Sequence, residues 1–179
     1  MSQELNNLAV KRGMALGFVV TLSLFVGLYF ISPKFTQELM LADRLKLGLE
    51  CLIFPALFFL VVVLRVGSQR FGNPAENPVE MMASSEGMKI DLRVLSNTHE
   101  QIVLFVINAL SLAVLLPYEY LSLLPIYSAL FVVGRILFWL GYRHKVLWRA
   151  PGFAMGVLPA VLGLGYSSIV IVVNVFSNT

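Results

Sequence analysis

Apolar residues run along this chain in five long blocks, separated by stretches in which charged residues, glycine and proline gather. The blocks cover residues 12–32, 46–64, 96–116, 118–142 and 152–176. Each block is long enough to cross a hydrocarbon layer of ~30 Å as a helix. A segment isolated in lipid must satisfy its own backbone hydrogen bonds, so we expect all five to be helical. The pattern predicts an all-α bundle of five transmembrane helices.

The connections between these blocks differ greatly in length. The longest polar stretch, residues 67–95, is expected to form a loop between the second and third spans. Residues 117–119 leave room only for a tight turn, so the third and fourth spans should form an antiparallel hairpin. Pro55 and Pro159 fall inside the second and fifth spans, where membrane helices tolerate a proline kink.

The amino-acid composition supports a membrane environment and argues against a disulfide-stabilised protein or a metal site. Hydrophobic residues make up 58% of the chain, charged residues only 13%, and the mean hydropathy is +0.83, so apolar surface must face lipid. The first block is too long for a cleaved signal peptide and is interpreted as a retained span. Cys51 is the single cysteine, which excludes an intrachain disulfide. With only two histidines, no metal site is expected.

Basic residues are divided unequally between the two ends of the predicted spans. One end would carry Lys11, Arg12, Arg65, Arg70, Lys89, Arg93, Arg143, Lys145 and Arg149. The opposite end would carry only Lys34, Arg44 and Lys46. These positions explain the net charge of +3 as a topology signal, without a nucleic-acid partner. The positive-inside rule then predicts a cytoplasmic N-terminus and a C-terminus on the opposite side, in a bacterial inner membrane or an endoplasmic reticulum membrane.

Polar residues form a stripe on the third span. Arg93, Asn97 and Glu100 lie within about 60° of arc at 100° per residue. Asn108 and Ser111 continue the stripe deeper into the membrane. Ionisable groups inside a span cost several kcal/mol unless they are paired, so each one needs a partner or a function.

The fourth span carries Arg135 and Tyr142 on one face, and the hairpin would allow Arg135 to meet Glu100. Such a pair is equally consistent with helix–helix adhesion and with a functional site. Further arginines gather at the same membrane end, where they fit interfacial anchoring or bidentate binding of an anionic, peptide-like ligand. They are Arg65, Arg93 and Arg149. This clustering toward one membrane face argues against a channel or transporter.

Three segments carry a family resemblance. Arg93-Val-Leu-Ser-Asn97-Thr-His-Glu100 resembles the Arg-x-x-x-Asn-x-x-Glu signature of the MAPEG family, the membrane-associated proteins of eicosanoid and glutathione metabolism. The stretch from Arg135 to Tyr142, followed by Arg149, is similar to the third core helix of that family and its following loop. Residues 64–74 resemble the end of its first core helix and an Asn-Pro turn. The match spans roughly residues 45–176 in the same order.

The resemblance implies a homotrimer of four-helix cores, with glutathione as co-substrate between neighbouring protomers. The core would occupy residues 45–179, after an extra N-terminal helix and loop at 1–44. The implied glutathione-binding residues are Arg65, Arg93, Asn97, Glu100, Arg135, Phe138 and Tyr142, with Arg135 orienting Glu100. Arg149 matches the arginine that stabilises the thiolate in catalytic members and is the predicted catalytic residue.

Departures from the family pattern narrow the expected activity. Phe138 replaces a tyrosine or histidine, and Gln101 and Val103 stand where eicosanoid-forming members often have an aromatic residue and a proline. These differences argue against a specific eicosanoid synthase. Two functions stay open: a glutathione-dependent transferase or peroxidase acting on lipophilic electrophiles or lipid hydroperoxides, and a non-catalytic member that binds lipid or a protein partner.

Overall fold

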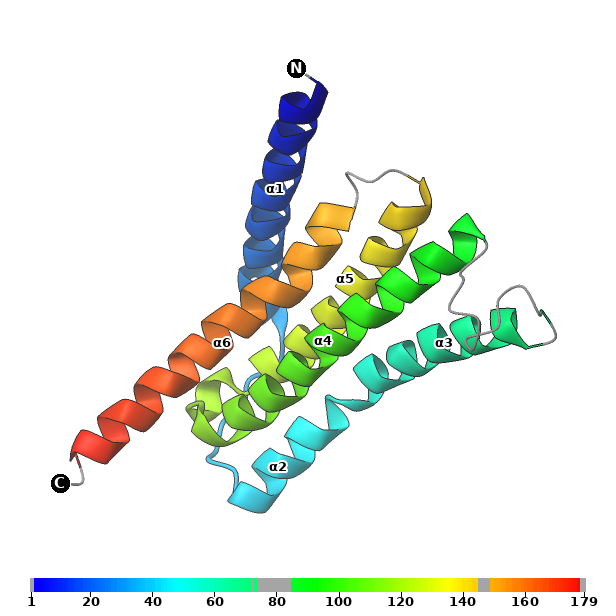
Figure 1. Cartoon of the computed structure of the whole chain (residues 1–179). Coiled ribbons are helices and arrows are strands. Elements are labelled where there is room, and N and C mark those ends of the chain that lie inside the picture. Colours follow the sequence, from blue (N-terminus) through cyan, green and yellow to red (C-terminus); the bar gives the residue numbers. More distant parts are fainter. Residues whose placement is uncertain (1, 72, 74–84, 145–148, 178–179) are drawn as a thin grey trace.

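The computed structural model describes residues 2–71, 73, 85–144 and 149–177, and this part of the chain is helical without a strand (Figure 1). The helices are α1 (Ser2–Ile31), α2 (Leu41–Glu50), α3 (Ile53–Arg70), α4 (Glu86–Leu115), the 3-10 turn η3 (Tyr118–Tyr120), α5 (Leu123–His144) and α6 (Arg149–Ser177). Five segments of the described chain are long and apolar enough to cross a membrane, α2 and α3 together forming the second. The predicted all-α bundle of five spans is confirmed.

A proline divides the second span into α2 and α3. Pro55 lies in the first turn of α3 and has no N–H to bond the Cys51 carbonyl four residues earlier. The helix breaks at Cys51 and Leu52, and the Ser128 hydroxyl of α5 donates to the freed carbonyl at 2.6 Å. The kink expected here is a two-residue interruption at which Cys51 and Leu52 keep helical backbone angles, and a neighbouring helix satisfies the freed carbonyl. Pro159, by contrast, lies inside α6, which continues through it.

The predicted loop over residues 67–95 is wrong at both ends. Helix α3 continues to Arg70, and α4 begins at Glu86, directly after Ser85, whose hydroxyl caps the first turn at 3.1 Å. The first turns of α4 carry charged residues, but they are helical because one face is buried. The buried side chains on that face are Met88, Asp91 and Val94. Residues 74–84, in the middle of the predicted loop, lie outside the described residues.

Helices α4 and α5 lie side by side, and aromatic packing holds them together. The Phe105 ring of α4 lies 4.6 Å from the Tyr127 ring and 4.7 Å from the Phe131 ring, both on α5. All three side chains are almost fully buried. Beyond the end of α4, Arg44 of α2 donates to the Leu116 carbonyl at 2.6 Å, where a cation suits the helix C-terminus.

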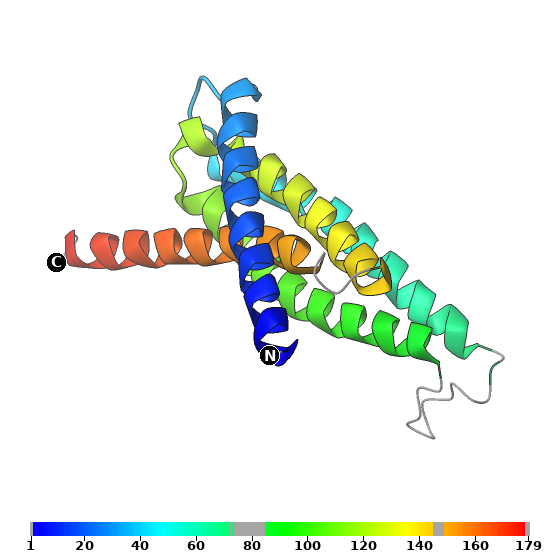
Figure 2. The ribbon, with the colours of Figure 1, turned by 90° about the horizontal axis from the view of Figure 1, so that it is seen from above.

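Helix α1 crosses the outside of the bundle and packs on α6, as Figure 2 shows. The crossing is close because Gly17 has no side chain. A Cβ at this position would lie 2.7 Å from the Pro151 Cα and 2.9 Å from the Ala154 Cβ. One turn later Thr21 is fully buried, and its hydroxyl donates to the Gly17 carbonyl at 2.6 Å. The N-terminal helix is therefore packed against the bundle, with its other side exposed.

The backbones of α5 and α6 touch near the polar end of the bundle. A Cβ on Gly152 of α6 would lie 2.5 Å from the Gly134 carbonyl oxygen and 2.5 Å from the Phe138 nitrogen, both on α5. Only glycine permits this approach. It brings the Gly152 carbonyl within reach of the polar side chains of α5, which form the candidate site.

Candidate functional site

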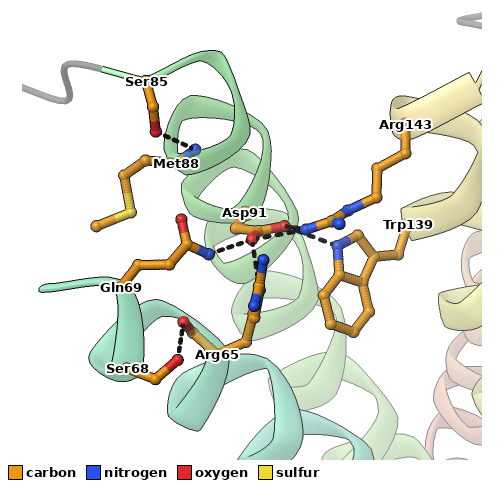
Figure 3. A network of polar contacts seen from close by, with 8 residues as sticks. All are labelled: Arg65, Ser68, Gln69, Ser85, Met88, Asp91, Trp139 and Arg143. Atoms are coloured by element: carbon orange, nitrogen blue, oxygen red, sulfur yellow. Dashed lines mark hydrogen bonds and ion pairs between the residues drawn. The ribbon is translucent and has the colours of Figure 1, made fainter. Parts of the chain in front are cut away.

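A fully buried carboxylate joins α3, α4 and α5 at one end of the bundle (Figure 3). It belongs to Asp91 of α4. The Arg143 Nη2 donates to its two oxygens at 2.8 and 2.9 Å, and the Arg65 Nε donates at 3.3 Å. The Gln69 Nε2 and the Trp139 Nε1 add hydrogen bonds of 2.5 and 2.8 Å. We call these five residues the Asp91 cluster.

Helical spacing explains why four donors converge on one carboxylate. Arg65 and Gln69 are four residues apart on α3, and Trp139 and Arg143 are four residues apart on α5, so each pair shares a helix face. Asp91 projects between the two faces (Figure 3). Its desolvation is offset because two cations and two neutral N–H groups donate to it.

The two arginines of the Asp91 cluster keep an outer surface exposed. Their side chains are 48% exposed for Arg65 and 38% exposed for Arg143, whereas Asp91 is not exposed at all. The Arg143 guanidinium also lies over the Trp139 ring, 5.5 Å from its centroid, which restrains the side chain. The cluster therefore presents a cationic surface that is fixed from behind by a buried carboxylate.

Arg135 is fully buried between α4, α5 and α6. Its Nη1 donates to the Asn97 Oδ1 at 2.8 Å, and its Nη2 donates to the Gly152 carbonyl at 3.0 Å. The Phe138 ring centroid lies 4.8 Å from the guanidinium carbon, where the ring face stabilises the cation. None of the ion pairs in the described part of the chain includes Arg135. Arg135 ties three helices together and fixes the side chain of Asn97.

The expected ion pair between Arg135 and Glu100 is not formed in the described structure. Glu100 is exposed on α4, and Arg135 meets Asn97, three residues earlier on the same helix. The contact of Arg135 with Gly152 of α6 holds the guanidinium at the turn of α4 that carries Asn97. The predicted orienting role of Arg135 is therefore corrected from Glu100 to Asn97. Arg93, on the same stripe of α4, is exposed.

Arg149 begins α6 and contacts Tyr142 near the end of α5. Its Nη1 donates to the Tyr142 hydroxyl at 3.2 Å, and its guanidinium carbon lies 5.2 Å from the ring centroid. The Tyr142 ring packs edge-on against Phe138, with 5.0 Å between ring centroids, and Phe138 is only 4% exposed. A continuous set of contacts thus runs from Arg149 into the bundle. Its members are Arg149, Tyr142, Phe138, Arg135 and Asn97.

Most of the Asp91 cluster was not predicted from the sequence. Asp91 fell within the predicted loop over residues 67–95, and Arg143 was grouped with the other basic residues at one membrane end. The available signal was the acid at the centre of a buried i, i+3, i+6 pattern on α4, because a buried acid requires partners. Lys145, which the sequence assigned to the same basic end, lies outside the described residues.

An apolar cavity of about 290 Å³ lies between α1 and helices α4, α5 and α6. Its walls include Phe25 of α1, Leu112 of α4, Tyr127 of α5 and Leu158 of α6. The lining consists of leucine, phenylalanine, tyrosine, proline and glycine, without a charged residue. Such a cavity suits an aliphatic chain and excludes an ion.

The fold and its arginine-rich end define a helical membrane protein with a cationic site. The chain belongs to the MAPEG family, whose family model matches residues 47–169, from α2 into α6. No curated protein and no solved structure matches the chain. Helix α1 precedes the matched region, so this protein is a family member extended by an N-terminal helix. Membership makes it a membrane protein of the glutathione and eicosanoid metabolism family.

Proposed function

We propose that this protein is a membrane-bound glutathione-dependent transferase or peroxidase that acts on lipophilic electrophiles or lipid hydroperoxides. The contact between Arg149 and Tyr142 carries the proposal, because it fixes a cation where α5 ends and α6 begins. A cation beside a thiol lowers the thiol pKa and raises the thiolate fraction. Family membership supports glutathione as the source of that thiol.

The exposed polar groups match the charges of glutathione. Arg65 and Arg93 are partly exposed cations suited to its carboxylates, and Glu100 is an exposed anion suited to its ammonium group. Asn97 has its Oδ1 engaged by Arg135, which leaves its amide N–H groups for the ligand. Arg135 and Phe138 are buried in the protomer and would act on the ligand through Asn97 and Tyr142.

The proposed reaction begins with attack by the glutathione thiolate. With an electrophilic carbon, a C–S bond forms and the leaving group departs with its electron pair. With a lipid hydroperoxide, the sulfur attacks the terminal oxygen, the O–O bond breaks, and the alkoxide takes a proton to become an alcohol. The resulting sulfenic acid of glutathione reacts with a second glutathione to give the disulfide and water. Arg149 stabilises the thiolate in both cases.

Glutathione binding tests the proposal directly. Reduced glutathione at about a thousandfold excess over its Kd should stabilise the purified protein by about 4 kcal/mol. For a chain of this size the melting temperature should rise by about 10 °C, measured in detergent micelles. An equal concentration of glutamate plus glycine controls for ionic effects. A folded protein whose melting temperature does not respond to millimolar glutathione would contradict the proposal.

We further infer that the protein assembles as a homotrimer, with the arginine-rich end in the cytoplasm. Arg93 and Glu100 are exposed and take no part in the set of contacts that leads from Arg149 to Asn97. A ligand that touches both groups fits a site completed by a neighbouring protomer. The unequal distribution of basic residues supports the orientation.

Mixed oligomers should reveal such a shared site. Arg93→Ala and Arg149→Ala, each with at most about a tenth of wild-type turnover alone, are expected to reach about a quarter of wild-type turnover when co-expressed in equal amounts. Random pairing leaves both arginines intact at that share of the interfaces. The measurement is conjugation of chlorodinitrobenzene by membranes that contain both variants. Turnover equal to the average of the two separate variants, at the same total amount of protein, would place the whole site in one protomer.

The apolar cavity favours a second candidate function, that of a non-catalytic family member that binds a lipid chain. Phe25, Leu112 and Leu158 provide a lining for such a chain within the spans. This candidate predicts co-purified lipid and no thermal response to glutathione. The first candidate predicts the response, so the same experiment separates the two.

A further inference from the structure

The Asp91 cluster holds more positive charge than its own carboxylate neutralises. Arg65 and Arg143 both pair with Asp91, which leaves one positive charge in excess within the cluster. Gln69 and Trp139 complete the hydrogen bonds of the fully buried carboxylate. An anion from outside the cluster would complete the charge balance of this partly exposed surface.

The bonds to Asp91 determine which guanidinium groups are left for that anion. Arg65 uses only its Nε, so its terminal edge, with Nη1 and Nη2, is not used by Asp91. Arg143 meets both Asp91 oxygens through Nη2 alone, and the Trp139 ring 5.5 Å away restrains its orientation. Guanidinium N–H groups held in this way match a carboxylate or a phosphate.

We propose that Arg143 is a further glutathione-binding residue, which binds one carboxylate of the tripeptide, and that Asp91 is a positioning residue for Arg143 and Arg65. This inference rests on the proposed function. Asp91 touches no ligand; it fixes both guanidinium groups from behind, so that less side-chain entropy is lost when the carboxylate binds. An anionic lipid headgroup has the same chemistry and is separated from glutathione in the test.

Truncated thiols test the role of Arg143. Glutathione has two carboxylates. The fragment γ-glutamylcysteinamide lacks the glycine carboxylate and ends in a neutral amide, and cysteinylglycine lacks the γ-glutamyl group with its carboxylate. The wild type should bind glutathione more tightly than both fragments, and Arg143→Gln should weaken glutathione binding by about 10- to 100-fold. In the same variant, the Kd of one fragment should stay within about twofold of the wild-type value. That fragment is the one that lacks the carboxylate bound by Arg143. Titration calorimetry in detergent gives all three Kd values.

Asp91→Asn tests the positioning role. This variant should weaken the binding of glutathione with the same selectivity as Arg143→Gln. The double variant Asp91→Asn/Arg143→Gln should bind glutathione no more weakly than the weaker-binding single variant, because both substitutions act through one contact. If Asp91→Asn does not fold, Asp91→Glu retains the charge at a shifted position and should still weaken glutathione selectively. Lys46→Gln is the matched control, since Lys46 is an exposed base on α2 outside the cluster.

Four outcomes would overturn the inference while leaving the proposed function intact. Arg143→Gln could weaken the binding of all three thiols equally, as a general loss of structure would. It could also weaken the binding of none of them. It could instead leave glutathione unchanged and lose retention on phosphatidylglycerol vesicles, which would assign the charge to lipid. A folded Asp91 variant that binds every thiol like the wild type would refute positioning. A wild type that binds no glutathione would refute the proposed function itself.

Discussion

Replacing Gly152 by alanine should lower the stability of the protein by about 3 kcal/mol, or about 10 °C in melting temperature. The new methyl group would lie 2.5 Å from the Gly134 carbonyl oxygen and from the Phe138 nitrogen. Both are backbone atoms of α5, so no side chain can move aside. Separating the helices would also remove the Gly152 carbonyl from the Arg135 Nη2, leaving a buried guanidinium with one fewer acceptor.

The matched control is Gly165→Ala in the same helix. A Cβ at Gly165 meets nothing within 4 Å, and alanine is the better helix former by about 1 kcal/mol. This variant should therefore melt at or slightly above the wild-type temperature in the same detergent. Equal melting temperatures for the two alanine variants would show that the α5–α6 contact is not close in the folded protein.

The spans were predictable because the length of an apolar run is fixed by the bilayer. The helix ends were not, because their limits depend on tertiary contacts. The first turns of α4 combine Lys89 and Arg93 with a buried face, so their mean hydropathy resembles that of a loop. The Ser85 cap was a visible local signal for this start. At the second span, Pro55 was visible in the sequence, but the Ser128 hydroxyl that bonds the freed Cys51 carbonyl was not predictable, because it comes from another helix.

The sequence predicted many of the polar residues of the candidate site, but only partly which of them contact one another. Asn97 and Glu100 lie on one stripe of α4, and their positions along it differ by less than one helical turn. Arg135 bonds Asn97 and also the Gly152 carbonyl of α6, so its choice between the two residues of the stripe depends on a third helix whose close approach the polar stripe does not reveal. Asp91 was missed for a related reason, since its partners come from two other helices.

Arg149→Ala should lower turnover near neutral pH by about 10- to 100-fold while leaving the fold intact. In the wild type the Arg149 cation, held by the Tyr142 hydroxyl at 3.2 Å, would stabilise the bound thiolate. Without it, the glutathione thiol should titrate near the ordinary thiol pKa of about 8.5, with only a few per cent thiolate at pH 7. Arg149 lies at the start of α6 and is not among the fully buried side chains, so its truncation removes the contact with Tyr142 but leaves the packed core in place.

The pH profile distinguishes loss of thiolate stabilisation from loss of structure. The Arg149 charge lowers the thiol pKa, so wild-type turnover should reach its plateau at a lower pH than that of the variant. The deficit of Arg149→Ala should be largest near pH 6 to 7 and should shrink as the pH rises through about 9. Arg149→Lys keeps the positive charge but lacks the planar guanidinium group. Its turnover near neutral pH should therefore lie between those of the wild type and Arg149→Ala. A deficit that is constant across this range, or full turnover in Arg149→Ala, would remove Arg149 from the catalytic role.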